Sequence, residues 1–173
     1  MTEFSIIEAR PWHCGSICRR LRLDHQKAIA KFGINSHMEL RARFDASAFR
    51  RAWFIDGRLA ALGGVTGSAL SATGFVWLCL TEDAIKYPLA TIKETKRQLA
   101  EIMVVKRTLV TAILDGDEIS KKFAIFMGFV PGELEPAMSK FGRRELERYC
   151  DNPSVRVPIG NGFATTMAYR EMA

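Results

Sequence analysis

Two periodicities of apolar residues alternate along this chain. Alternating or continuously apolar runs predict strands at 4–9, 49–55, 59–65, 75–80, 108–114, 155–159 and 163–170. Apolar residues at helical spacing predict helices at 14–32, 36–45 and 88–106, with a shorter helix after residue 117. The strands at 75–80 and 108–114 are apolar throughout, which is typical of strands buried on both faces. The resulting order, β-α-α-β-β-β-α-β-α-β with one further late strand, predicts an α/β domain.

Turn and cap residues fix several of these boundaries. Asp56 and Gly57 separate two strand patterns, and this dipeptide favours a hairpin with a type I′ turn. Ser36 followed by Glu39 fits a capping box, so we expect a helix to begin there. Pro88 is suited to the first position of the long helix.

The length of 173 residues indicates a single domain over 1–173, with a polar and helical insertion at 133–149. No run of about 18 apolar residues occurs, so we expect no membrane-spanning segment. The first ten residues carry acidic side chains and alternate like a strand, which argues against a signal peptide. The four cysteines lack disulfide-framework or zinc-ribbon spacing, and a reducing cytoplasm is the simplest setting.

The corner formed by residues 108–130 is the most informative segment. An apolar strand is followed by Asp-Gly-Asp, a short amphipathic helix and Gly-Phe. This resembles the last strand–helix–strand unit of the GNAT (GCN5-related N-acetyltransferase) superfamily. Asp117 takes the place of the Asn that often ends the strand there, and Ser120 and Phe123 take the Ala and apolar places. Ala124 stands where the catalytic Tyr would be.

That resemblance implies a GNAT-like α/β fold, a mixed sheet flanked by helices, and acyl-CoA-dependent N-acyl transfer. GNAT enzymes bind the coenzyme A pyrophosphate on a glycine-rich turn before the long helix. Residues 81–88 stand there without glycine, Glu82 and Asp83 add negative charge, and Pro88 removes an N–H donor. We therefore expect no required cofactor and weak binding of acetyl-CoA at most.

If acetyl-CoA binds, the same region supplies the candidate cofactor residues. Lys86 and Lys93 are the cations, and Leu80 and Tyr87 flank the turn. Tyr87 is also the nearest phenol in this region that could act as an acid, although a role in packing or beside the helix cap explains it better.

A narrower resemblance covers residues 1–132. The segment 76–85, followed by Pro88 and by Glu94-Thr95-Lys96-Arg97, is similar to the GNAT-like internal virion or core proteins of short-tailed bacteriophages. Thr95-Lys96-Arg97 replaces the Ser-Arg-Arg of that pattern. The resemblance implies phage structural or assembly proteins as partners, and a location in the host cytoplasm or the virion.

Acidic residues are the candidates for catalysis. Glu82 and Asp117 follow two neighbouring strands, together with Asp83 and Asp115, and paired carboxylates there could raise one pKa and make a base. The alternative is that they cap the helices that follow, as expected of Asp117 before Glu-Ile-Ser. Ala124 supplies no acid partner.

Two further patterns carry little chemistry. A zinc site would need four closely placed ligands, and the candidates fit core positions better, so we expect no metal. These candidates are His13, Cys14, Cys18 and His25.

A basic helix face is either solvated surface or a contact for nucleic acid or an acidic protein, and the net charge of +6 does not decide between them. Its members are Arg19, Arg20, Arg22 and Lys27.

Three functional hypotheses therefore stand. The first is a phage or prophage protein with a degenerate acyl-CoA site that acts in virion assembly or as a virion-associated factor. The second is an active acetyl-CoA-dependent N-acetyltransferase with an atypical donor site. The third, motivated by charge alone, is a nucleic-acid-associated factor.

Overall fold

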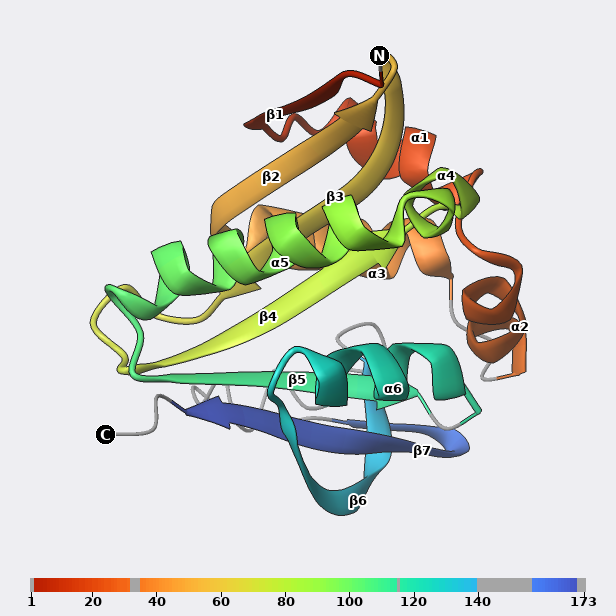
Figure 1. Cartoon of the computed structure of the whole chain (residues 1–173). Helices are drawn as coiled ribbons and strands as arrows, with labels where there is room; N and C mark the ends of the chain where they lie inside the picture. The colour runs from red at the N-terminus through yellow and green to blue at the C-terminus, as the bar shows by residue number, and fades with distance from the viewer. Residues whose placement is uncertain (1, 32–34, 115, 140–156, 171–173) are drawn as a thin grey trace.

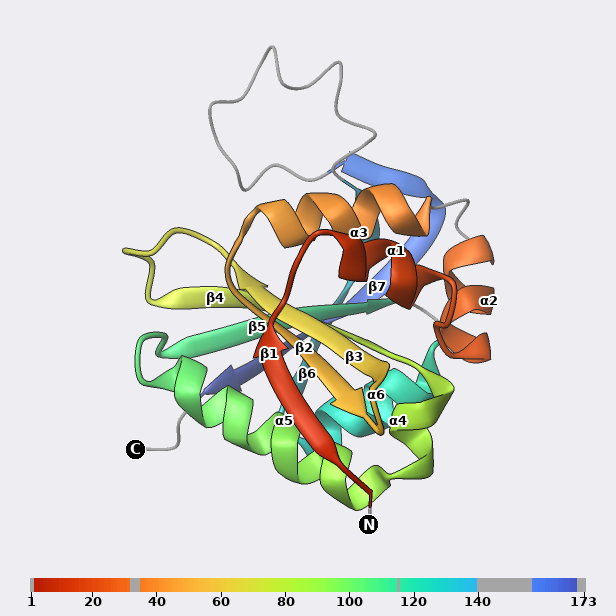
Figure 2. The same cartoon turned by 90° about the horizontal axis from the view of Figure 1, so that it is seen from above.

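The structure, a computed structural model, describes residues 2–31, 35–114, 116–139 and 157–170. Within these ranges one seven-stranded sheet has the order β1-β2-β3-β4-β5-β7-β6. Helices cover both faces: α1 and α3 lie on one side, and α5 and α6 lie on the other (Figures 1 and 2). The strands are β1 (Phe4–Glu8), β2 (Ser47–Ile55), β3 (Arg58–Thr66), β4 (Thr73–Leu80), β5 (Thr108–Leu114), β6 (Val130–Ser139) and β7 (Val157–Arg170). The helices are α1 (Trp12–Cys18), α2 (Leu23–Lys31), α3 (Ser36–Asp45), α4 (Glu82–Lys86), α5 (Pro88–Met103) and α6 (Glu118–Phe126).

The predicted hairpin is confirmed. β2 and β3 pair antiparallel, and Ile55 opposes Arg58 across the turn. Asp56 and Gly57 both have positive φ, at 48° and 71°. Two successive residues in the left-handed region define the type I′ geometry that the Asp-Gly pair favours.

The single helix predicted for 14–32 is wrong, because the structure has two helices there, α1 and α2. Between them the chain leaves the helical path and pairs with the end of β4, where Leu21 and Thr81 form an antiparallel bridge. The Arg22 N–H also donates to the Leu80 carbonyl at 3.2 Å. A tertiary backbone contact has therefore displaced a local helical preference.

The helix α3 begins where expected, but its cap differs from the prediction. Asn35 is the N-cap residue, and its side-chain oxygen accepts a hydrogen bond from the Met38 N–H at 3.1 Å. The capping box beginning at Ser36 is therefore wrong by one residue, since Asn is as good an N-cap as Ser and comes first.

β4 and β5 are adjacent and parallel, as a strand–helix–strand crossover through α5 requires. Their pairing covers only three residue pairs, from Thr73 with Thr108 to Phe75 with Val110. Beyond these pairs the two strands diverge toward their C-terminal ends (Figure 1). Gly74 permits close packing at the paired end, because a Cβ atom there would lie 2.8 Å from Val65 Cγ1 of β3 and 3.3 Å from Leu109 Cδ2 of β5.

The last part of the sheet corrects two further predictions. β7 is one strand where two had been predicted at 155–159 and 163–170, and it lies between β5 and β6. Residues 133–139 belong to β6 rather than to a helical insertion, and 140–149 lie outside the described residues.

Two apolar clusters hold the layers together. One packs the sheet against α1 and α3 and contains Ile17, Phe44 and Leu62, and the other packs α5 and α6 against β5 through Leu99 and Leu109. Along β4 only Gly74 and Trp77 are fully buried, and the other apolar side chains of residues 75–80 are half-buried. This differs from the strand buried on both faces that the sequence predicts. None of the described helices is both long and apolar enough to cross a membrane.

Candidate functional site

The divergence of β4 and β5 opens a cavity of about 1270 Å³. Residues 75–80 of β4 and 111–114 of β5 line it. Leu40 of α3 and Ile92 of α5 also line it, so the cavity extends to both faces of the sheet. The half-buried apolar residues of β4 are therefore cavity walls.

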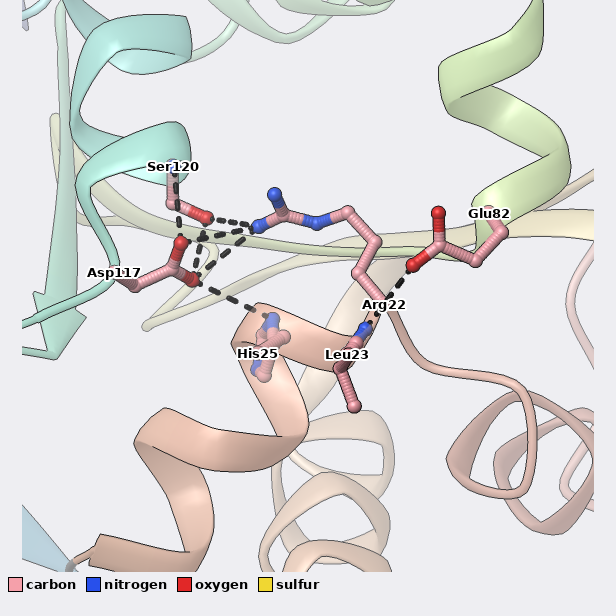
Figure 3. A network of polar contacts seen from close by, with 6 residues as sticks. All are labelled: Arg22, Leu23, His25, Glu82, Asp117 and Ser120. Carbon is pink, nitrogen blue, oxygen red and sulfur yellow. Dashed lines mark hydrogen bonds and ion pairs between the residues drawn. The ribbon is translucent and has the colours of Figure 1, made fainter.

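A buried polar network crosses the wide end of this gap (Figure 3). Arg22 Nη2 donates to both carboxylate oxygens of Asp117, at 3.2 and 3.3 Å, and to Ser120 Oγ at 2.7 Å. Asp117 is the N-cap of α6: its Oδ1 accepts from the Ser120 N–H at 3.1 Å, and its Oδ2 accepts from Ser120 Oγ at 2.7 Å. The predicted capping role of Asp117 is thus confirmed, and the same carboxylate also neutralises Arg22.

The network keeps Asp117 ionised. Burial by itself would raise the pKa of this carboxyl, but the hydrogen bonds from Ser120 and the charge of Arg22 outweigh it and lower the pKa below its usual value. A carboxylate with a lowered pKa and two hydrogen-bond partners is a weak base. Its geometry therefore suits it to orienting and stabilising cationic neighbours.

His25 is the second titratable group that contacts this network. Its Nδ1 lies 3.9 Å from Asp117 Oδ2, and the residue lines the cavity. Burial lowers the pKa of His25, the Arg22 and Arg43 charges lower it further, and Asp117 only partly opposes them. The imidazole is therefore neutral at pH 7 and has a nitrogen lone pair available.

The edge of β4 carries backbone hydrogen-bonding groups that face the gap. The Leu80 carbonyl accepts from Arg22 on this side, whereas the next N–H, that of Thr81, points to β3. Because groups alternate along a strand, the N–H and C=O of Val76 and Leu78 point the same way as those of Leu80. Among the described strands, none pairs with this edge beyond Phe75.

The acidic residues of the turn before α5 have structural partners. Glu82 Oε1 accepts from the Leu23 N–H at 3.1 Å, at the start of α2. Asp83 forms ion pairs with Arg20 and with Lys86, whose Nζ lies 3.2 Å from Asp83 Oδ1. Glu82 and Lys86 are not among the residues that line the large cavity.

The remaining predicted cofactor residues lie in different places. Leu80 lines the large cavity. Tyr87 stacks edge-on against Phe4, with ring centroids 5.8 Å apart, and packs against a small apolar cluster. Lys93 lines a second, smaller cavity of about 520 Å³ beside β1 and β2. The structure therefore does not bring these residues together around one ligand site.

Sequence reasoning missed the roles of Arg22 and His25. Both had been placed on a long helix, Arg22 on a solvated basic face and His25 in a metal hypothesis. Arg22 lies in the segment that leaves the helix to pair with β4, and its partner Asp117 is 95 positions away. No local pattern signals that contact.

The cysteines and histidines do not form a metal centre among the described residues, where no group of three or more metal-binding side chains occurs. Cys14 is packed in the interior and Cys79 is half-buried in the cavity wall, and burial raises their pKa values to about 11 and about 12. His13 Nδ1 accepts from the Arg10 N–H at 2.9 Å at the start of α1.

Several solved structures named as acetyltransferases share this architecture. The ribosomal-protein-S18-alanine N-acetyltransferase from Escherichia coli matches with a TM-score of 0.56 and 15% identity, covering 100% of this chain and 96% of that chain. A GNAT-family acetyltransferase from Streptococcus pneumoniae matches with a TM-score of 0.54 and 12% identity, covering 97% and 99%. The Microcin C7 self immunity acetyltransferase MccE, in complex with acetyl-CoA and AMP, matches with a TM-score of 0.60 and 9% identity, covering 97% and 92%.

These likenesses show a GNAT fold, as the sequence predicts. No protein-family model and no curated protein sequence matches the chain.

Proposed function

We propose that this protein binds the extended arm of an acyl-coenzyme A-type thioester along β4 and transfers its acyl group to an amine. The observation that carries the proposal is the unpaired edge of β4 inside a cavity open to both faces of the sheet. An extended, amide-bearing ligand can pair with such an edge as an added strand does. An acceptor can then approach from the opposite face.

Two residues of the cavity wall carry a buried polar atom without a partner, and these atoms support an amide-bearing ligand. Trp53 Nε1 and Gln98 Oε1 have no hydrogen-bond partner among the described residues, and both residues line the cavity. One is a donor and the other an acceptor, and an amide group supplies the complement of each. Buried polar groups without partners are uncommon and call for a ligand or water.

The chemistry assigns His25 to proton transfer. The amine nitrogen attacks the thioester carbonyl, forming the C–N bond, and neutral His25 takes the proton that this nitrogen loses. The C–S bond then breaks, and protonated His25 returns the proton to the departing thiolate. Asp117 stabilises the imidazolium in between. This route needs no acid at Ala124.

The test is acetyl transfer from acetyl-CoA to a panel of primary amines, measured by thiol release. We expect slow turnover that His25→Gln reduces at least tenfold in a folded protein. His37→Gln is the matched control, because His37 is exposed on α3 and does not line the cavity. Binding without turnover, or equal activity in the two variants, contradicts the role of His25.

A second candidate is a phage or prophage protein that works in virion assembly without turning over acetyl-CoA. It is supported by the resemblance of segment 76–97 and by the turn before α5, where Arg20 and Lys86 are already paired with Asp83. Such a turn offers little to a diphosphate. Failure of acetyl-CoA to bind at millimolar concentration, with the protein present in purified phage particles by mass spectrometry, would favour this candidate over the first.

A further inference from the structure

Arg22 is buried with much of its hydrogen-bonding capacity unused. Its side chain is 3% exposed, and Nη2 makes all of its contacts to Asp117 and Ser120. Nε and Nη1 have no hydrogen-bond partner among the described residues. A guanidinium carries five N–H donors, so three of them lack an acceptor.

These unpaired donors point away from the Asp117 side of the network. Figure 3 shows the guanidinium nitrogen that carries no dashed line, Nη1, directed away from Asp117 and His25. Arg22 lines the large cavity, and so do Ser120 of α6 and Ala84 of α4. Arg22 is therefore part of the wall of the site, and its unpaired Nε and Nη1 are buried within that wall.

The charge of the cavity favours a negative ligand. Three arginines line it, Arg22, Arg43 and Arg51, against two carboxylates, Glu39 and Asp117, and His25 is neutral at pH 7. Three positive and two negative charges leave an excess of one positive charge, and because Arg22 pairs with Asp117 and Arg43 with Glu39, this excess is the charge of Arg51. Guanidinium groups bind carboxylate and phosphate oxygens through short, charge-assisted hydrogen bonds.

We propose that Arg22 is an oxyanion-binding residue, whose Nε and Nη1 donate to a carboxylate or phosphate group of the ligand in the cavity. The inference rests on the proposed function only for the identity of the whole ligand, because an oxyanion can bind here whether or not acyl transfer occurs. The two sources of the oxyanion are a phosphate of the thioester donor and a carboxylate of the amine acceptor.

The test uses the intact protein labelled with ¹⁵N, and follows the Arg22 Nε–H signal during titration with inorganic phosphate and with acetate at constant ionic strength set by chloride. We expect a saturable shift with a millimolar midpoint for at least one anion. Arg22→Lys should weaken that binding roughly tenfold, as loss of a charge-assisted pair predicts. Arg43→Lys is the matched control, because Arg43 lines the same cavity but pairs with Glu39.

Two further arms identify the source. If Arg22→Lys weakens acetyl-CoA but not S-acetylpantetheine, which lacks phosphate, the oxyanion belongs to the donor. If each thioester binds wild type and Arg22→Lys equally well, while Arg22→Lys no longer binds acetate, the oxyanion belongs to the acceptor. If the Arg22 Nε–H signal of the wild-type protein shifts only linearly with phosphate and acetate, as it does with chloride, the proposal is overturned whatever the variants show. If acyl transfer is nevertheless observed, only the anion-binding role of Arg22 has failed, and the proposed function stands.

Discussion

The guanidinium of Arg22 and the carboxylate of Asp117 form an ion pair in which the side chains are 3% and 4% exposed. Arg22 is anchored by its backbone to the end of β4, and Asp117 follows β5 as the cap of α6. The pair therefore links the C-terminal ends of β4 and β5, which diverge from one another. One carboxylate thus serves both local helix capping and long-range charge neutralisation.

Asp117→Asn should be strongly destabilising, because it keeps an oxygen for the Ser120 N–H but leaves the Arg22 charge buried without a counter-ion. We expect the free energy of unfolding to fall by about 3–5 kcal/mol. Asp117→Ala should cost about 1 kcal/mol more through loss of the cap. Urea denaturation measures both values.

The double variant Arg22→Met with Asp117→Asn should lose less stability than the sum of its single changes, since it removes both charges. Asp45→Asn is the control, because Asp45 pairs with Arg41 on the exposed face of α3 and should cost about 0–1 kcal/mol. If the free energy of unfolding of Asp117→Asn equals that of wild type, the buried Arg22 charge does not need the Asp117 carboxylate as a counter-ion.

Stability should fall as the pH drops below about 6.5, the usual pKa of histidine in an unfolded chain. Burial lowers the pKa of His25 in the folded state, so below that pH the unfolded state binds more protons and unfolding is favoured. Thermal melting from pH 8 to pH 5 should show this loss, and His25→Gln should show less of it.

His13 also has a lowered pKa, but it contributes equally to both proteins and cancels in their difference. The lowered pKa of Asp117 stabilises the fold above about pH 3.9 and is lost only under more acidic conditions, outside this range. If the difference between wild type and His25→Gln does not change with pH, His25 is not buried as a neutral group.

Gly64→Ala should destabilise the protein by about 1–3 kcal/mol, because an added Cβ would lie 2.7 Å from the Phe49 carbonyl oxygen and 2.7 Å from the Trp77 ring. Gly15→Ala in α1 is the control, since its nearest neighbour would be His37 at 3.7 Å. That change should be neutral or stabilising by up to about 1 kcal/mol. Guanidinium unfolding of both proteins tests the prediction, and equal stabilities would contradict it.

Lys106→Met should loosen the loop between β3 and β4. The buried Lys106 Nζ donates to the carbonyls of Ser68 and Ser71, each at 2.7 Å. Removing the ammonium leaves these carbonyls without their donor and should cost about 1–3 kcal/mol. Hydrogen exchange should become faster at residues 67–72. The exposed neighbour Arg107, changed to Met, should stay within about 0.5 kcal/mol of wild type and show unchanged exchange.

Local sequence patterns predict most of the fold because most elements obey local rules. The Asp56-Gly57 turn, the apolar run of β5 and Pro88 at the start of α5 each determine their own structure. The errors occur where distant contacts prevail. The segment Arg19–Arg22 leaves the helix to pair with Thr81, and residues 133–139 extend β6 along β7.

The site is harder to predict than the fold because its chemistry depends on pairs far apart in sequence. Asp117 is recognisable as a cap from the residues beside it. That it also binds Arg22 and lies near His25 depends on where α2 packs, which no periodicity reports. The acidic turn at Glu82 and Asp83 is visible in the sequence, but its partners Leu23 and Arg20 are not.

The gap between β4 and β5 is bounded at both of its ends by contacts between the two sides. Three residue pairs close one end, and Arg22 with Asp117 closes the other. A ligand that widened the gap at this end would have to separate Arg22 from Asp117. Loss of this buried ion pair should lower the melting temperature, so the same contact links the width of the gap to the stability of the protein.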